Sequence, residues 1–168
     1  IKRRVDERIP LSYITNEAYL QGYSFYVDKR VIIPRSFIAE HIVNNQLDEW
    51  IEHPELVNNV LDLCTGNGSL ATIAAHHYYD AEVVASDISE DALDVATINI
   101  ERNQVTDRVT LIKSDLFNEL GDYFETFDLI LTNPPYVDTR RMESLPKEYL
   151  YEPNLALFGG SDGLDRKS

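Results

Sequence analysis

The sequence predicts an α/β domain built on a doubly wound parallel sheet, preceded by a small segment of helix and β-hairpin. From about residue 60 onward, short apolar runs alternate with segments of helical length and spacing, which is the pattern of parallel strands joined by crossover helices. The first apolar run ends in Gly66-Asn67-Gly68, and a glycine turn at this place is typical of parallel sheets that bind a ligand beyond the ends of their strands. We therefore divide the chain into residues 1–35, a linker of helix and hairpin, and residues 36–168, the sheet domain.

Residues 1–35 carry the signals of one short helix and one hairpin. Pro10 favours the first turn of a helix between residues 9 and 19. Two aromatic-rich runs, 18–20 and 23–27, flank Gln21-Gly22 and predict two antiparallel strands around a tight turn.

Residues 36–168 carry the alternation of strands and helices. Ser36 is placed to cap a helix that reaches about Trp50, with an apolar face of Ile38, Ile42, Val43 and Leu47. Four strands are predicted, at 60–63, 82–86, 109–112 and 127–132. Helices between them are expected at 69–79 and, capped by Ser89, along Leu93, Ala96 and Ile100.

The fourth strand bears on how complete the sheet is. Leu129-Ile130-Leu131 is apolar on both faces, as in a central strand. A bare outer edge of this kind tends to pair with other chains. We expect the sheet domain to be truncated at its C-terminal end, with the final strands missing, or its edge to be hidden by self-association of the chain.

Composition narrows the class of partner. The formal net charge is −14, and an acidic surface repels phosphate backbones, so a basic protein is a better direct substrate than a nucleic acid. An acidic surface that only keeps the protein soluble explains this net charge equally well. No apolar run approaches the ~20 residues of a membrane span, so no membrane partner is expected. The single cysteine, Cys64, fits a reducing cytoplasm.

The first candidate site is the loop Asp62-Leu63-Cys64-Thr65-Gly66-Asn67-Gly68. Its glycines permit close approach of a ligand, and the following helix start offers free N–H groups. The spacing of Gly66, Gly68 and Ala71 also satisfies a dinucleotide-binding pattern. The carboxylate of Asp62 would repel a pyrophosphate, however, and suits a ligand with an ammonium and a sulfonium group. S-Adenosylmethionine has both groups and no phosphate. We assign to its binding Asp62, Leu63, Cys64, Thr65, Gly66 and Gly68 in this loop, and Asp87, Ile88, Asp115, Leu116 and Asn133 after the later strands.

Two further strand ends offer carboxylates to the same cofactor. Asp87 ends the second strand, where an acid can accept hydrogen bonds from both ribose hydroxyls, and Ile88 follows it. Asp115 and Leu116 come after the third strand. There Asp115 would accept from the adenine amino group and Leu116 would pack on the ring. A helix cap for Asp87 and a local turn for Asp115 are the alternative roles.

The most specific feature is Asn133-Pro134-Pro135-Tyr136, directly after the fourth strand. The prolines fix an extended backbone and remove two N–H donors, which leaves carbonyl oxygens free to accept. The Asn133 side-chain oxygen and the Pro134 carbonyl could hold both hydrogens of a target NH2, with Tyr136 as an aromatic face for a planar group. Methyl transfer from a sulfonium depends on alignment more than on a strong base. The motif therefore predicts a methyltransferase that acts on an amide or amino nitrogen.

The sequence predicts neither a metal site nor a nucleophile. His41, His53, His76 and His77 lack the spacing of metal ligands relative to any Cys or acid cluster. Cys64 has no evident base partner.

Together these motifs resemble the HemK-type glutamine methyltransferases. The resemblance rests on Arg8–Ile14, Ile33-Pro34-Arg35-Ser36 with Glu40, the loop 62–68, the Asn-Pro-Pro-Tyr motif, and a stretch from Glu152-Pro153 through Gly159-Gly160 to Asp162-Gly163-Leu164. Ser36 stands where the release-factor-modifying branch usually has proline. This favours the branch that modifies a ribosomal protein of the large subunit.

The resemblance implies a Rossmann-like enzyme that uses S-adenosylmethionine to methylate the side-chain amide nitrogen of a protein glutamine. It implies that residues 62–66 surround the methionine part of the cofactor, Asp87 binds the ribose and Leu116 lies beside the adenine. Substrate binding falls to Asn133, Pro134, Pro135, Tyr136 and Arg35, and catalysis to Asn133, Pro134 and Tyr136. The family commonly has Gly where Cys64 stands, and its chains begin with a longer helical domain and continue past Ser168.

Three other functions stay open. An adenine-amino methyltransferase of DNA or RNA would use the same Asn-Pro-Pro-Tyr chemistry, although it needs a flipped base and a basic surface. A nicotinamide oxidoreductase fits the glycines, but not Asp62 or the paired prolines. The third is a scaffold that binds the cofactor without catalysis.

Overall fold

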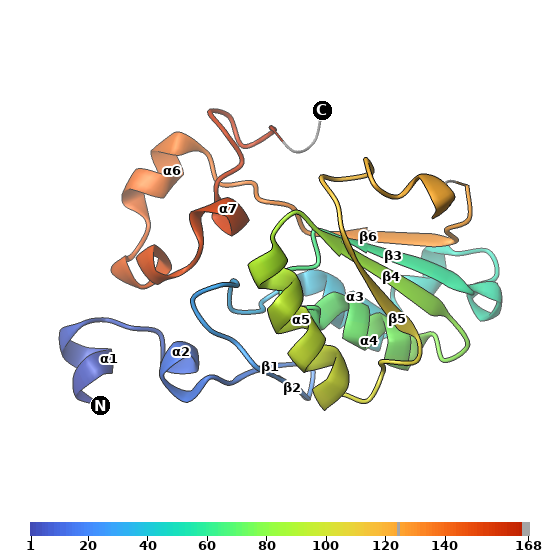
Figure 1. Ribbon diagram of the computed structural model, residues 1–168, viewed down its shortest axis with the longest axis horizontal. Helices are drawn as coiled ribbons and strands as arrows, with labels where there is room; N and C mark the ends of the chain where they lie inside the picture. Colours follow the sequence, from blue (N-terminus) through green and yellow to red (C-terminus); the bar gives the residue numbers. More distant parts are fainter. Residues whose placement is uncertain (124, 166–168) are drawn as a thin grey trace.

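A four-stranded parallel sheet organises the chain. The computed structural model describes residues 1–123 and 125–165. The strands are β3 (Asn59–Leu63), β4 (Glu82–Asp87), β5 (Val109–Lys113) and β6 (Leu129–Thr132), and they lie in the order β5-β4-β3-β6 (Figure 1). The chain runs outward from β3 to β5 and then returns to the other side of β3. This reversal of direction confirms the predicted doubly wound α/β fold.

Both faces of the sheet are covered, by different means. One face packs on helices α3 (Phe37–Val43), α4 (Ser69–His77) and α5 (Glu90–Arg102), through strand residues such as Val60 and Val83 (Figure 1). The other face, with Leu61 and Val84, packs on the residues between β5 and β6, which include the 3-10 helix η3 (Gly121–Tyr123). Because successive strand side chains point to opposite faces, the apolar runs fill two separate layers.

The helix predicted from Ser36 to about Trp50 is wrong in its length. Ser36 caps α3 as expected, since its hydroxyl accepts the N–H of Ile38 at 3.2 Å. The helix ends at Val43, however, and Val43 is exposed. Soon after, Asn45 has a left-handed backbone with φ of +58°, a conformation that Asn tolerates and that stops a helix. Two 3-10 helices follow, η1 (Asp48–Trp50) and η2 (Pro54–Leu56). None of the helices in the described part of the chain is long and apolar enough to cross a membrane.

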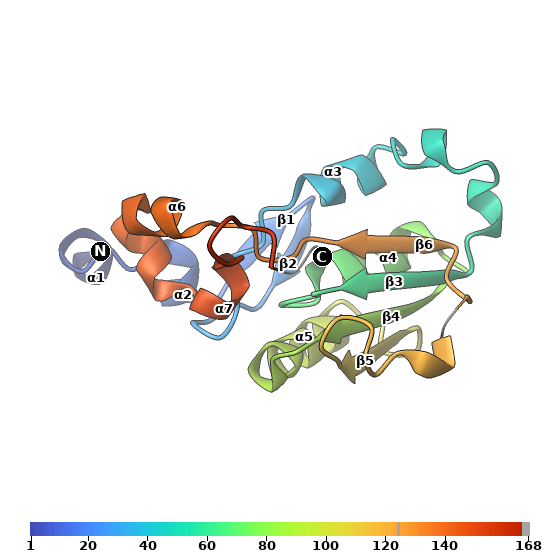
Figure 2. The ribbon, with the colours of Figure 1, turned by 90° about the horizontal axis from the view of Figure 1, so that it is seen from above.

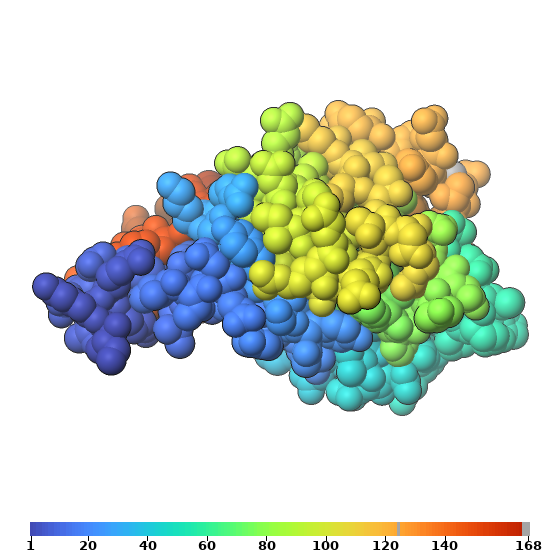
Figure 3. Space-filling model, turned by 60° about the horizontal axis from the view of Figure 1, so that its bottom comes forward, coloured from blue at the N-terminus to red at the C-terminus, as the bar shows by residue number. Residues whose placement is uncertain are grey.

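The N-terminal segment contains the hairpin that the sequence predicts and a helix shorter than the predicted residues 9–19, because the left-handed backbone of Asn16 ends it at Thr15. Helices α1 (Lys2–Asp6) and α2 (Leu11–Thr15) precede strands β1 (Ala18–Leu20) and β2 (Tyr23–Phe25). Gln21 and Gly22 both have positive φ, +50° and +85°, as in the two-residue turns that match the twist of a hairpin. In Figure 3 the first residues of this segment, in blue, project from the body of the sheet and its helices. A domain boundary at residue 35 stays a prediction.

A buried asparagine joins the hairpin to the sheet domain. Asn99 of α5 accepts the N–H of Tyr26 at 2.6 Å, and it donates to the carbonyls of Tyr26 at 3.0 Å and Asn67 at 2.9 Å. Asn99 belongs to the buried stripe of α5, whose other members are Ala92, Val95, Ala96 and Ile100. Leu93, predicted on that stripe, is only half-buried. One side chain thus fixes the residues after β2, helix α5 and the glycine loop to one another.

The segment after β6 packs against the N-terminal segment. It contains α6 (Thr139–Ser144), η4 (Lys147–Tyr151) and α7 (Asn154–Leu157), and in Figure 2 it lies beside α1 and α2. Glu148 accepts from Arg4 at 3.1 Å and from Arg8 at 2.8 Å. Strand β6 forms an edge of the described sheet, with Ile130 49% exposed. Covering of this edge by further strands or by self-association stays a prediction.

Candidate active site

A cleft opens at the carboxyl ends of the parallel strands, where ligands bind in this class of fold. The space between its walls, together with the open solvent at its mouth, is about 720 Å³. The site residues predicted from the sequence that line it are Leu63, Cys64, Gly66, Asp87, Ile88, Asp115, Leu116, Asn133 and Pro135. The structure thus brings the loops after all four strands to one cavity. The roles of these residues toward a ligand stay predictions.

The glycine loop has a backbone that few residue types adopt readily. Gly66 and Gly68 have φ of +58° and +77°, and Cys64 lies in the same left-handed region at +62°. A Cβ on Gly68 would lie 3.1 Å from the Cβ of Ala96 in α5. Gly68 is not among the residues that line the cleft. It shapes the loop from behind, by letting α4 and α5 approach each other.

Asp62 lies beneath the loop and not on the wall of the cleft. Its side chain is fully buried, and Oδ2 accepts the Thr65 hydroxyl at 2.5 Å and the N–H of Ala71 in α4 at 2.9 Å. Oδ1 has no hydrogen-bond partner among the described residues. Burial raises the pKa of Asp62 to about 7, against the lowering effect of these two hydrogen bonds. The carboxyl group therefore holds the loop against the helix, and contact of Asp62 or Thr65 with the cofactor stays a prediction.

Asp87 connects the loops that follow β3 and β4. One carboxylate oxygen accepts the N–H of Gly66 at 2.9 Å, and the other accepts the N–H of Ser89 at 3.0 Å. A carboxylate oxygen can accept more than one hydrogen bond, so Asp87 can still accept from a ligand in the cleft that it lines. The preceding residue, Ser86, also lines the cleft, and its buried hydroxyl has no partner among the described residues.

The turn after β5 forms another wall of the cleft. Leu116 has φ of +54°, and the Ser114 hydroxyl donates to its carbonyl at 2.6 Å. The N–H of Asp115 donates to the Glu119 carboxylate at 2.9 Å. These bonds hold a non-glycine residue in a left-handed turn and present Asp115 and Leu116 to the cleft.

The Asn-Pro-Pro-Tyr motif follows β6 at the same edge of the sheet. Asn133 and Pro135 line the cleft, whereas Pro134 and Tyr136 are not among its lining residues. Tyr136 is 55% exposed. The motif therefore offers its first and third residues to the cavity and an aromatic side chain to the surface next to them.

Two glycines support this motif from behind. A Cβ on Gly159 would lie 2.7 Å from the carbonyl oxygen of Pro135, and one on Gly163 would lie 2.5 Å from that of Tyr136. Only glycine therefore lets residues 159–163 pack on the backbone of the motif. The sequence shows these glycines, but not what they contact.

Arg35, predicted to bind substrate, lies outside the lining of the cleft. Its guanidinium donates two hydrogen bonds to the Glu152 carboxylate, at 2.8 and 2.7 Å, and lies 5.0 Å from the centre of the Tyr149 ring. The Glu152 side chain is 4% exposed, and the bidentate pair compensates the burial of its charge. Because Pro153 lines the cleft, this pair positions one of its walls. Contact of Arg35 with substrate stays a prediction.

The sequence-based prediction missed about half of the cleft wall. The missed residues are Arg30, Val31, Ile32, Ser86, Ser89, Ala92, Ser114, Pro153, Leu155 and Ala156. Three of them are serines beside predicted strand ends, and a wider window around each strand end would have included them. Residues 30–32 and 153–156 carry no such local signal, because only the packing of distant segments brings them to the cleft.

These observations define the class of protein. No group of three His, Cys, Asp or Glu residues in the described part of the chain could hold a metal ion. The site is a small-molecule cleft at the point where the strand order reverses, with acids after two strands and an Asn-Pro-Pro-Tyr motif after a third. The fold is therefore a Rossmann-like domain of the methyltransferase type.

The chain belongs to the methyltransferase small domain family, which it matches over residues 40–152. It is 54% identical over 165 residues to the ribosomal protein uL3 glutamine methyltransferase of Neisseria meningitidis serogroup A, covering 98% of this chain and 53% of that protein. The chain spans about half the length of the curated relatives it matches.

Solved structures share the fold. The T. thermophilus 16S rRNA N2 G1207 methyltransferase RsmC, in complex with AdoMet and guanosine, gives a TM-score of 0.56 at 28% identity, over 72% of this chain and 32% of that one. The human METTL16 catalytic domain, in complex with an RNA hairpin, gives a TM-score of 0.60 at 13% identity, over 95% of this chain and 68% of that one. At 13% identity the second likeness shows the fold alone.

Proposed function

We propose that this chain forms the cofactor-binding and catalytic region of an S-adenosylmethionine-dependent methyltransferase that modifies a glutamine side chain in a large-subunit ribosomal protein. One observation carries the proposal: Asn133 and Pro135 line the same cleft as Asp87 and Asp115. A cofactor and a planar amide can therefore meet in one cavity. The name of the Neisseria relative supports the choice of substrate.

The residues of the cleft suit this cofactor. Asp87 and Asp115 offer acceptors for ribose hydroxyls and an adenine amino group, and Leu116 offers an apolar surface for the ring. The buried hydroxyl of Ser86 lacks a partner among the described residues, a costly state that a polar ligand group would relieve. When bound, S-adenosylmethionine supplies a methyl group activated by its sulfonium.

The Asn-Pro-Pro-Tyr motif would position the substrate amide. The Asn133 side-chain oxygen and the Pro134 carbonyl oxygen can accept the two N–H groups of a glutamine NH2, which fixes the plane of the amide. Accepting both hydrogen bonds also raises the electron density on the nitrogen. The nitrogen becomes acidic as its new bond to carbon forms, so its proton can leave without a strong base. Alignment and charge placement are then the main contributions of the protein.

The charge of the chain favours a protein as substrate. With a formal net charge of −14, the chain would attract a basic ribosomal protein and repel a nucleic acid. An adenine-amino methyltransferase would use the same two oxygen acceptors to hold the adenine amino group. An experiment must therefore distinguish methylation of adenine from methylation of glutamine. With a ribosomal substrate, we propose a cytoplasmic location for the enzyme.

Methyl transfer in vitro tests the proposal. The purified protein is incubated with labelled S-adenosylmethionine and, in parallel, with unmethylated large-subunit ribosomal proteins, ribosomal RNA and DNA. We expect label in one ribosomal protein, located by peptide mass spectrometry on a glutamine, and labelling at least about 100-fold slower with Asn133→Ala. Label in RNA or DNA and none in protein would show that the alternative is correct.

A further inference from the structure

Residues 37–56, which contain α3, η1 and η2, expose more apolar surface than their packing requires. We call them the 37–56 strip. In Figure 2 the strip, in blue to teal, lies on the β6 side of the sheet. Its inner side packs on the core through the buried Ala39 and Ile42. Four large apolar side chains remain in contact with solvent: Phe37 at 79% exposure, Val43 at 39%, Trp50 at 80% and Leu56 at 59%.

The longer helix α5 is a suitable comparison, because it also covers the sheet with one side facing solvent. Over its 13 residues the one exposed large apolar side chain is Ile98, at 37%. Single exposed apolar residues are normal on a soluble protein, whereas a group of them marks a surface that contacts a partner. Exposed Trp and Phe are the types most enriched at such surfaces.

The charge of the strip indicates the kind of partner. No Lys or Arg lies between Arg35 and Arg102 in the sequence. Within the described part of the chain, the ion pairs of the strip are those of Glu55 with His53 at 3.4 Å and of Asp48 with His77 at 3.5 Å. The strip has no Lys or Arg to balance its five acids, which are Glu40, Asp48, Glu49, Glu52 and Glu55.

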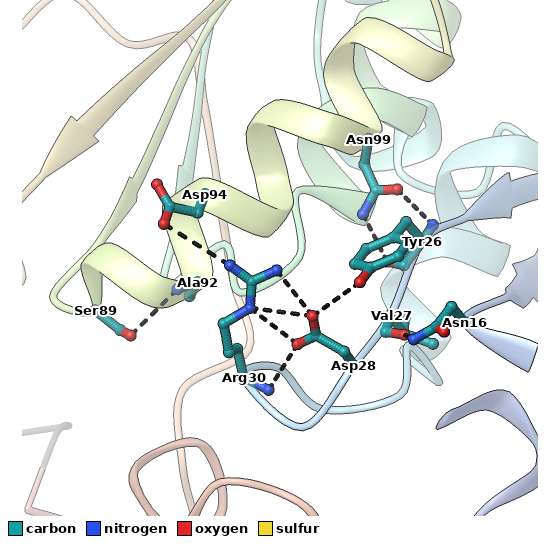
Figure 4. Close-up of polar contacts among 9 residues, drawn as sticks. All are labelled: Asn16, Tyr26, Val27, Asp28, Arg30, Ser89, Ala92, Asp94 and Asn99. Atoms are coloured by element: carbon teal, nitrogen blue, oxygen red, sulfur yellow. Dashed lines mark hydrogen bonds and ion pairs between the residues drawn. The ribbon is translucent and has the colours of Figure 1, made fainter. Parts of the chain in front are cut away.

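Several acids outside the strip do have basic partners. Asp28 accepts from Arg30 at 2.8 Å (Figure 4), and Glu148 contacts Arg4 and Arg8 at 3.1 and 2.8 Å. A carboxylate paired with a guanidinium has little field left for a partner, whereas unpaired carboxylates attract cations on an approaching protein. The exposed apolar residues of the strip therefore lie within an uncompensated negative field.

The strip begins beside the part of the cleft that we propose for the substrate. Ser36 caps α3, and the residue before it, Arg35, donates to Glu152 at 2.8 and 2.7 Å. Pro153 follows and lines the cleft. A protein bound along the strip would therefore approach the cleft from this wall.

We propose that the 37–56 strip is a docking surface for a basic segment of the ribosomal protein substrate, separate from the glutamine that is methylated. The inference rests on the proposed function. Phe37 and Trp50 would contact apolar side chains of this segment, and the carboxylates would contact its Lys and Arg. A nucleic acid has no cations to offer. A second copy of this chain, with a formal net charge of −14, would be repelled.

Two substrates separate docking from catalysis: the whole ribosomal protein, and a short peptide around the methylated glutamine that cannot reach the strip. In Glu49→Gln/Glu52→Gln/Glu55→Gln we expect the KM for the whole protein to rise about 10-fold at low salt, with kcat unchanged. The difference should shrink as salt screens the charges. Transfer to the peptide should equal that of the wild type, which also shows that the variant is folded.

A matched control removes three carboxylates elsewhere. Glu101→Gln/Asp107→Asn/Asp122→Asn changes exposed acids of α5, the turn after it and η3. This variant has the same net charge as the strip variant. It should keep the KM of the wild type for both substrates.

Trp50 is the single tryptophan of the chain, so its fluorescence reports contact with the strip. The difference between wild type and Trp50→Phe isolates its emission, which should move to shorter wavelength when the whole ribosomal protein is added. Trp50→Ala should raise the KM for the whole protein about 10-fold or more, as expected for a central aromatic contact.

Four outcomes would overturn the inference. They are an unchanged KM in both strip variants, an equal rise in the charge-matched control, an equal loss of transfer to peptide and whole protein, and self-association of the wild type that Trp50→Ala abolishes. In each case the wild type still methylates the ribosomal protein, so the proposed function stands. If the wild type methylates no ribosomal protein, the proposed function is wrong and the inference fails with it.

Discussion

The two halves of the cleft are held in place by different kinds of interaction. In the loops after β3 and β4 the bonds lie within the core: Asp62 accepts from Ala71, and Asp87 from Gly66. After the Asn-Pro-Pro-Tyr motif, two backbone hydrogen bonds join Val137 to Leu157 and Gly159, and the side-chain ties are ion pairs such as Arg35 with Glu152, whose side chains are 40% and 4% exposed. The half that we propose for the cofactor is therefore held by hydrogen bonds in the core, whereas the half that we propose for the substrate is held by ties that include a half-exposed ion pair.

This difference suits the two ligands of a methyltransferase. A small cofactor binds best to a rigid site, because little ordering is then required on binding. A protein substrate needs a surface that can adjust, and segments with few buried contacts open at the lowest free energy. Variants in the half proposed for the cofactor should therefore lose cofactor affinity. Variants in the half proposed for the substrate should lose transfer rate or affinity for the ribosomal protein.

The largest effect is expected at Asn133. Asn133→Ala should lower the rate of methyl transfer about 100- to 1,000-fold, because it removes a positioned polar contact in the transition state. Single-turnover transfer to ribosomal protein at saturating cofactor measures this rate. Asn44→Ala, which changes an exposed asparagine after α3, should transfer at the normal rate. A normal rate in Asn133→Ala would remove this residue from the mechanism.

Asp62 should make the rigid half sensitive to pH. Its pKa is about 7 in the fold and about 3.9 in an unfolded chain. Between these values the unfolded chain releases a proton that the folded protein keeps, so this group lowers stability as pH rises from about 4 to 7. Asp62→Asn has no charge to bury. Its stability relative to wild type should therefore improve by about 3–4 kcal/mol between pH 4 and pH 7.5.

Urea unfolding of both proteins at several pH values measures this difference. Parallel stability curves for wild type and Asp62→Asn would show that the carboxyl group titrates normally. Asp62 would then no longer support the view that a buried carboxyl group belongs to the rigid half.

In the adjustable half, the Arg35–Glu152 pair should couple by about 1–2 kcal/mol. This value lies below that of a fully buried pair because Arg35 is 40% exposed. A double-mutant cycle of Arg35→Gln and Glu152→Gln, followed by unfolding, measures it. The same variants should raise the KM for ribosomal protein and leave cofactor affinity unchanged. The exposed pair Lys113–Glu90 is the control and should show no measurable coupling, and additive effects at Arg35 and Glu152 would contradict the assignment.

Cys64 should give the smallest effect. Its φ of +62° is strained for any residue with a Cβ, and glycine relieves the strain at the cost of a more flexible unfolded chain. Cys64→Gly should therefore be more stable than wild type by less than about 1 kcal/mol, whereas Cys64→Val should be less stable by about 1–2 kcal/mol. Thermal melts compare the three proteins. A Val variant as stable as wild type would show that the loop is less rigid than its hydrogen bonds indicate.

The sequence predicted the features that depend on neighbouring residues. Strand alternation, the Gln21-Gly22 turn and the Ser36 cap are local, and each was found at its predicted position. The length of the helix after Ser36 was wrong, because the left-handed backbone of Asn45 decides where it ends. Apolar periodicity does not reveal a backbone conformation of this kind.

Features that depend on distant residues could not be predicted. The sequence places Asp62 at a strand end, but its burial under Thr65 and Ala71 follows from how the loop folds back. Arg30 reaches the cleft because Asn99 holds the preceding segment on α5. Pairings across tens of residues leave no pattern in a single sequence.

One calorimetric comparison tests the division between the halves most directly. S-Adenosylhomocysteine is titrated into wild type, Asp87→Ala and Asn133→Ala. We predict that Asp87→Ala weakens binding by about 1–3 kcal/mol, the loss of a hydrogen-bonding partner, and that Asn133→Ala changes the affinity by less than about threefold. Unchanged affinity in Asp87→Ala, together with a large loss in Asn133→Ala, would contradict the account.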